Sequence, residues 1–109
     1  MGKVSLQMMA ALSNDNSRQT VMLDVKVRRK GESWFRSRIT EMSLSGFRLQ
    51  SSARFSIGME IYVMFSGFEG RRASVSWVRN HVAGCRFENS LHPAIFDYIL
   101  RMSEPPPEE

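Results

Sequence analysis

The amino-acid sequence predicts a small all-β protein, a six-stranded antiparallel β-barrel that carries one C-terminal α-helix. Three observations support this fold class. Apolar and polar residues alternate with a period of two through most of the 109 residues, as they do in half-buried strands. Short turns that contain glycine separate the alternating stretches, and a helical period appears only near the end of the chain.

Six alternating stretches are expected to form the strands. The first is the clearest, because aliphatic residues occupy its odd positions while Asp24 and Lys26 occupy even ones. The stretch 28–32 that follows it has the composition of a hairpin turn. The expected strands span residues 21–27, 33–40, 47–50, 59–65, 71–79 and 82–88.

The last element is expected to be a helix over residues 93–102. Its proline suits the first helical turn, and Arg101 suits the negative end of the helix dipole. His92, just before it, is expected to cap the helix. The apolar stripe expected to face the barrel consists of Ile95, Ile99 and Met102.

The domain itself is expected to span residues 14–103. Residues 1–13 are expected to form an N-terminal arm, either flexible or weakly helical. Three prolines and three glutamates predict a disordered acidic tail over residues 104–109.

The sequence argues against an enzyme and against a resident metal or other cofactor. Its one cysteine, Cys85, allows no intramolecular disulfide, and with two histidines it cannot build a thiolate-rich zinc site. His81 and Cys85 would lie about 13 Å apart along a strand, too far for a nucleophile and its base. The sequence contains no carboxylate pair and no glycine-rich phosphate loop. Cys85 is therefore expected to be a small core residue.

Membrane insertion is not expected, because the apolar runs are only a handful of residues long. The apolar stretch at residues 8–12 is too short for a signal peptide. We therefore expect a cytoplasmic protein.

Positive charge is the main compositional signal. Without the three glutamates of the acidic tail, residues 1–103 carry fifteen cationic side chains against eight acidic ones, a net charge of +7. Twelve of the fifteen are arginines, whose planar forks suit phosphates and guanine edges better than lysine does. This composition indicates an anionic partner, with a basic solvated surface as the simpler alternative.

A short motif lies after the second expected strand. The residues from Glu41 to Gly46 read E-M-S-L-S-G, and Arg18 lies 23 positions before this motif. Further on come V-x-W-V-R from Val75 and G-C-R-F from Gly84. In order and spacing these features resemble the PilZ domain, whose signature is RxxxR followed by [D/N]xSxxG. The resemblance covers about residues 14–102.

The resemblance implies a bacterial receptor module for cyclic di-GMP, a flat dianion with two phosphates and two guanine edges. By position, Arg18 corresponds to the second arginine of RxxxR and would hold phosphate or guanine. Ser43 would help to read the base, and Gly46 would shape the loop. A carboxylate at Glu41 can accept hydrogen bonds from the guanine amino and imino groups. The residues that the resemblance places less firmly in the site are Asn14, Arg36 and Arg48.

Two departures from the family pattern are expected to weaken ligand binding. Asn14 stands where the first arginine is expected, which removes a charge-assisted contact worth roughly 1.5–3 kcal/mol. Glu41 replaces Asp or Asn and moves the carboxylate by more than about 1 Å. A micromolar site altered in these ways would weaken to roughly 100 μM or beyond.

Two functions therefore stay open. In the first, the domain binds cyclic di-GMP and relays binding to a protein effector. In the second, it is a ligand-independent adaptor with an exposed apolar patch around Trp34, Met64 or Phe68. DNA or RNA binding is not expected, because Trp34 is the one aromatic residue among the arginines that would contact phosphates.

Overall fold

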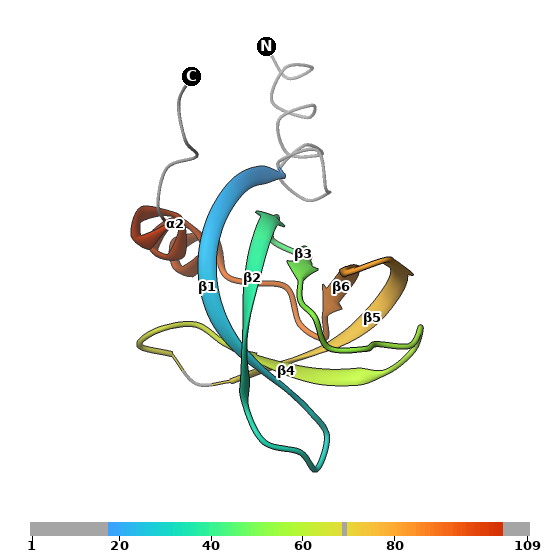
Figure 1. Cartoon of the computed structure of the whole chain (residues 1–109). Coiled ribbons are helices and arrows are strands. Elements are labelled where there is room, and N and C mark those ends of the chain that lie inside the picture. Colours follow the sequence, from blue (N-terminus) through green and yellow to red (C-terminus); the bar gives the residue numbers. More distant parts are fainter. Residues whose placement is uncertain (1–17, 69, 104–109) are drawn as a thin grey trace.

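Six antiparallel strands form a closed barrel in this computed structural model, which describes residues 18–68 and 70–103 (Figure 1). Asn14, the expected arm at 1–13 and the expected tail at 104–109 therefore lie outside the described residues. The predicted fold class, a six-stranded antiparallel barrel with one C-terminal helix, is confirmed. The elements are β1 (Gln19–Arg29), β2 (Phe35–Met42), β3 (Gly46–Gln50), β4 (Glu60–Met64), β5 (Arg71–Arg79), β6 (Val82–Phe87) and α2 (Pro93–Met102).

The strands follow the order β1-β2-β3-β6-β5-β4 around the barrel, and β4 pairs with β1 to close it. Closure removes the exposed edges that make open sheets prone to aggregation. In this order the β3–β6 pair is separated from the β1–β4 pair by β2 on one side and β5 on the other. The two pairs therefore lie on opposite sides of the barrel.

The core is built from the inward positions of the strands, as the alternating pattern predicts. Phe47 and Phe87 pack together with their ring centroids 5.0 Å apart. Among the residues that the structure describes, six are completely buried from solvent, namely Val27, Ile39, Met42, Leu49, Ile61 and Val63.

Some element boundaries differ from those expected. The strand expected at 33–40 begins and ends two residues later, and it lies between a turn with Gly31 at φ 82° and the turn that starts at Ser43. In the turn at Gly31 the Glu32 N–H donates to the Arg29 carbonyl oxygen over 2.9 Å. Positive φ favours glycine, so this residue fixes where the turn lies.

The buried face of α2 also differs from the prediction. Ile99 is buried and Ile95 packs against the core, but Met102 is 36% exposed. Phe96 and Leu100 pack against the core instead, because the inward stripe is centred between Ile99 and Phe96. Met102 then lies at the margin of the stripe.

Both ends of α2 are held by specific hydrogen bonds. As predicted, His92 caps the helix, and its Nδ1 accepts a hydrogen bond from the Ala94 N–H over 3.0 Å. At the other end the Ser103 Oγ accepts from the Met22 N–H of β1 over 3.1 Å. The helix is thus attached to the first half of β1. Within the described residues, no helix has the length and apolar character needed to cross a membrane.

The prediction of an exposed apolar patch is wrong for two of its three residues. Trp34 is 36% exposed, but Met64 and Phe68 are both half-buried. Phe68 packs edge-on against Tyr98 of α2, with the ring centroids 5.5 Å apart. The largest exposure among the large apolar side chains of the described residues is that of Ile57, at 72%.

Cys85 is a core residue, as predicted. Its side chain is buried on β6, and burial raises the pKa of the thiol to about 12. The thiol is therefore neutral near pH 7, and its Sγ lies 3.9 Å from the Ala83 carbonyl oxygen.

We expect Cys85 to resist alkylation while the protein is folded. With the pKa raised from 9.0 to about 12, the thiolate fraction at pH 8 falls by roughly a thousand-fold. Iodoacetamide labelling followed by mass spectrometry should show slow modification in buffer and fast modification in urea. Equal rates in the two conditions would contradict this account.

The same shift predicts that stability falls at high pH. The unfolded chain loses the thiol proton near pH 9, whereas the folded protein keeps it up to about pH 12. The free energy of unfolding should therefore decrease as the pH rises above 9. Urea titrations of the Cys85→Ala variant are the control, because this contribution to the slope should be absent there.

Candidate functional site

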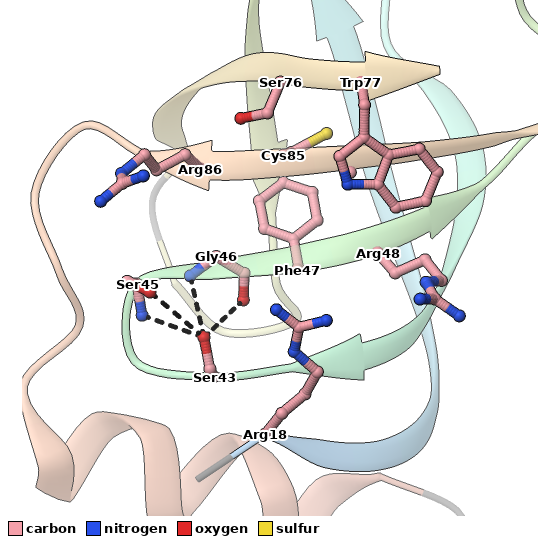
Figure 2. A pocket seen from close by; sticks show the side chains of 11 residues that line it. Arg18, Ser43, Ser45, Gly46, Phe47, Arg48, Ser76, Trp77, Cys85 and Arg86 are labelled. Atoms are coloured by element: carbon pink, nitrogen blue, oxygen red, sulfur yellow. Dashed lines mark hydrogen bonds between the residues drawn. The ribbon is translucent and has the colours of Figure 1, made fainter. Parts of the chain in front are cut away.

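A shallow pocket lies on the outer side of the β3–β6 pair, next to the beginning of β1 (Figure 2). Its volume is about 190 Å³. Four of the residues proposed from the sequence line it together: Arg18, Ser43, Gly46 and the less firmly placed Arg48. The remaining lining residues are Ser45, Phe47, Ser76, Trp77, Gly84, Cys85 and Arg86.

Ser43 organises the loop between β2 and β3. Its side chain is 2% exposed, and its Oγ accepts hydrogen bonds from the backbone N–H groups of Gly46 over 3.2 Å and Ser45 over 3.3 Å (Figure 2). The Ser43 N–H donates to the Gly46 carbonyl oxygen over 2.9 Å. A hydroxyl that bonds neighbouring backbone groups fixes a tight turn. Ser43 therefore holds the rim of the pocket in shape.

Gly46 is needed for close packing between strands. Its φ is not positive, unlike those of Gly31, Gly58 and Gly67. A Cβ at this position would overlap the backbone carbonyl oxygen of Cys85 on β6. Any side chain at Gly46 would therefore push β3 away from β6.

Two arginines and one carboxylate form a charged cluster at the rim. Glu41 Oε1 lies 3.4 Å from Nη1 of Arg18, and Glu41 Oε2 lies 3.3 Å from Nη1 of Arg48. All three side chains are partly exposed, and such ion pairs contribute little to stability. With Arg86 added, the pocket has an excess of two positive charges.

Trp77 is one of the pocket residues that the sequence analysis did not select. A period of two would place it on the same face as Val75, but a register shift in the β5–β6 ladder lies between these two residues. The indole is 37% exposed and lies over Gly84, where a Cβ would overlap the ring. The guanidinium of Arg48 lies 5.6 Å from the ring centroid. A bulge of this kind has no clear sequence signal.

Two residues proposed from the sequence do not line this pocket. Glu41 stands behind Arg18 and Arg48 rather than on the pocket wall. Arg36 lines grooves beside Asp24 on another part of the barrel.

The pocket suits a flat anionic ligand. It combines guanidinium groups, a partly exposed indole and a loop whose backbone is fixed by Ser43. Arginine forks bind phosphate or guanine edges in a bidentate manner, and an indole can stack on a base. The volume of about 190 Å³ is smaller than that of most ligand pockets, so a large ligand would extend over the rim. Within the described residues, no group of three His, Cys, Asp or Glu side chains could hold a metal ion.

We expect Gly46→Ala to lower the free energy of unfolding more than Gly84→Ala does. The Gly46 substitution places a methyl group against backbone and should lower the free energy of unfolding by about 1–3 kcal/mol. The atoms nearest to a methyl group at Gly84 belong to the half-exposed Trp77 side chain, which is freer to shift than backbone is. Urea denaturation should show the larger loss for Gly46→Ala, and an unchanged midpoint in that variant would refute the packing role.

A family model supports what the geometry suggests. The PilZ domain model matches residues 14–103, a span that includes the whole barrel and α2. Comparison with curated proteins gave no match. PilZ domains are typically receptor modules for cyclic di-GMP and are generally not catalytic. On the strength of this match and of its closed barrel, the chain belongs to the PilZ domain family.

Proposed function

We propose that this protein is a cyclic di-GMP receptor that binds the dinucleotide at the pocket beside β3 and β6. We further propose that it works in the bacterial cytoplasm and relays ligand binding to a protein effector. The observation that carries the proposal is the position of Arg18 next to the Ser43–Gly46 loop in one pocket. A guanidinium near a tight serine–glycine loop offers donors to a phosphate or to the O6 and N7 atoms of guanine.

Each residue of the site has a proposed task. Arg18 and Arg48 bind phosphate or the guanine edge, while Ser43 and Gly46 keep the loop in shape. Glu41 does not line the pocket, so it accepts hydrogen bonds from the guanine amino and imino groups only after it has left Arg18 and Arg48. The indole of Trp77 is 37% exposed, and it stacks against a base when the guanidinium of Arg48, 5.6 Å from the ring centroid, turns toward the ligand.

Glu41 also limits the affinity. Its two carboxylate oxygens face Arg18 and Arg48, so the ligand has to compete for both guanidinium groups. These ion pairs are long and partly exposed, so the ligand can displace Glu41. The displacement still lowers the affinity for the ligand. Together with Asn14 in place of the first arginine, this arrangement leads us to expect a Kd of roughly 100 μM.

The second candidate function is a ligand-independent adaptor. The observation in its favour is that Glu41 already occupies Arg18 and Arg48. If no ligand displaces Glu41, its ion pairs with Arg18 and Arg48 belong to the surface of the folded domain and bind no ligand. Calorimetric titration with cyclic di-GMP up to about 1 mM separates the two functions, because the adaptor should give no heat.

We expect Arg18→Ala to abolish the binding of cyclic di-GMP. Loss of one charge-assisted contact from a site near 100 μM should move the Kd beyond about 1 mM. Calorimetry and amide shifts near Ser43 report the binding. The control is Arg54→Ala, because Arg54 is exposed and lies outside the pocket. Unchanged affinity in Arg18→Ala would show that the site assignment is wrong.

We expect Asn14→Arg to tighten binding by about ten-fold or more, because it restores the first arginine of the family signature. The matched control is Asn16→Arg, which makes the same exchange and adds the same charge two positions away. If both variants tighten binding equally, the gain reflects net charge and not the motif. No gain in Asn14→Arg would mean that position 14 does not reach the ligand.

A further inference from the structure

We infer that the outer face of β1, β2 and β4 binds an extended acidic segment of a partner protein. The surface consists of three cations and two aromatic residues, and we call it the basic strip; its residues are Lys26, Arg28, Arg36, Trp34 and Tyr62. It lies on the β1–β4 side of the barrel, opposite the β3–β6 pair that carries the pocket. This inference does not depend on ligand binding in the pocket.

Two like charges face each other in the strip, and the carboxylate beside them, Asp24, pairs with a different cation, Arg38. Lys26 of β1 and Arg36 of β2 are direct partners in the antiparallel register, and both are exposed. Like charges at such positions destabilise a sheet. Within the described residues neither forms an ion pair, because the nearby Asp24 is held by Arg38 over 3.2 Å. An anionic partner would turn this repulsion into attraction.

Arg28 is fixed in place by aromatic rings. Its guanidinium lies 5.2 Å from the ring centroid of Trp34 and 4.8 Å from that of Tyr62. Its Nε is buried and makes no hydrogen bond among the described residues. Cation–π contacts of this kind hold the arginine without neutralising its charge. The strip therefore presents a preorganised cation, which reduces the entropy lost on binding.

The spacing of the cations suits an extended peptide. Lys26 and Arg28 are two residues apart on one strand and point to the same face, so their side chains emerge about 7 Å apart. An extended peptide with an acidic residue at every second position repeats its carboxylates at the same distance. Carboxylates and cations can therefore match one to one.

A groove next to the cations can take an apolar side chain. It has a volume of about 420 Å³ and is lined by Lys26 and Arg36 together with Met64 and Phe65. Asp24 also lines it, and its carboxylate is paired with Arg38 over 3.2 Å. Met64 is half-buried, and methionine adapts its shape easily to a neighbour. This groove favours a segment in which apolar residues alternate with the acidic ones.

The aromatic residues of the strip argue against single-stranded nucleic acid. Such ligands need open ring faces on which bases can stack. Tyr62 has Arg28 on one side and Arg72 within 5.8 Å of its centroid, and Trp34 has Arg28 and lies against Gly70. The rings are thus already occupied in holding arginines.

A labelled peptide tests the inference directly. The probe is a rhodamine-labelled peptide, E-L-E-V-E-L-E-V-E, and the control has the same composition with its glutamates in one block. Fluorescence anisotropy at low salt should give a Kd below about 100 μM for the alternating peptide and weaker binding for the control. Binding should weaken in 0.5 M salt because the charges are exposed.

Charge reversal locates the contact. Lys26→Glu and Arg36→Glu should each weaken peptide binding by about ten-fold, whereas Arg54→Glu, with the same change in net charge, should change it by less than about two-fold. Lys26→Arg should keep the affinity, and thermal melts verify that all variants are folded. Titration of Lys26→Glu with cyclic di-GMP should match that of the unmodified protein, which separates this inference from the proposed function.

Three results would overturn the inference. One is the lack of peptide binding up to about 1 mM. Another is an equal loss in Arg54→Glu, which would indicate a general charge effect. The third is binding of a twelve-residue oligothymidine, or of phosphatidylserine vesicles, that is tighter than binding of the alternating peptide and is abolished by Lys26→Glu and Arg36→Glu. The strip would then bind a nucleic acid or a membrane.

Discussion

Closure of the sheet between β1 and β4 is the constraint on which both the pocket and the basic strip depend. Only Lys26–Arg29 of β1 pair with β4, so the first half of the strand is free of β4 and is attached to α2 through Met22 and Ser103. This arrangement holds Arg18, the residue before β1, beside the loop after β2. The paired half places Arg28 against Tyr62. One strand thus positions a residue of the pocket and the centre of the basic strip.

The charged residues of the two surfaces are compensated differently. At the pocket, Glu41 lies within ion-pairing distance of two arginines, so an incoming anion meets a partly neutralised cluster. On the strip, Lys26 and Arg36 have no such partner among the described residues, and Arg28 is held by rings. The cations of the strip therefore keep their charge unneutralised, whereas those of the pocket are partly neutralised by Glu41.

The sequence was sufficient for the fold because alternation and glycine turns act locally. The number of strands, the cap at His92 and burial of Cys85 follow from such local signals or from the resemblance to the family. The outward position of Trp77 was not predictable, since it depends on a register shift between two strands. The bridging position of Glu41 was missed for a similar reason, because its partners Arg18 and Arg48 come from different segments. The positions of Trp77 and Glu41 thus depend on how distant strands pair, which the composition of the sequence does not reveal.

Every strand of the barrel has a hydrogen-bonded neighbour on both sides, and this limits how a peptide can be recognised. A partner cannot extend the sheet along the β1–β4 seam, so its main chain stays unbonded there. Side chains lean along the strand direction, but they fix the direction of a bound chain less strictly than main-chain hydrogen bonds do. A segment with carboxylates at alternate positions is therefore less restricted in its direction than a peptide that extends a sheet.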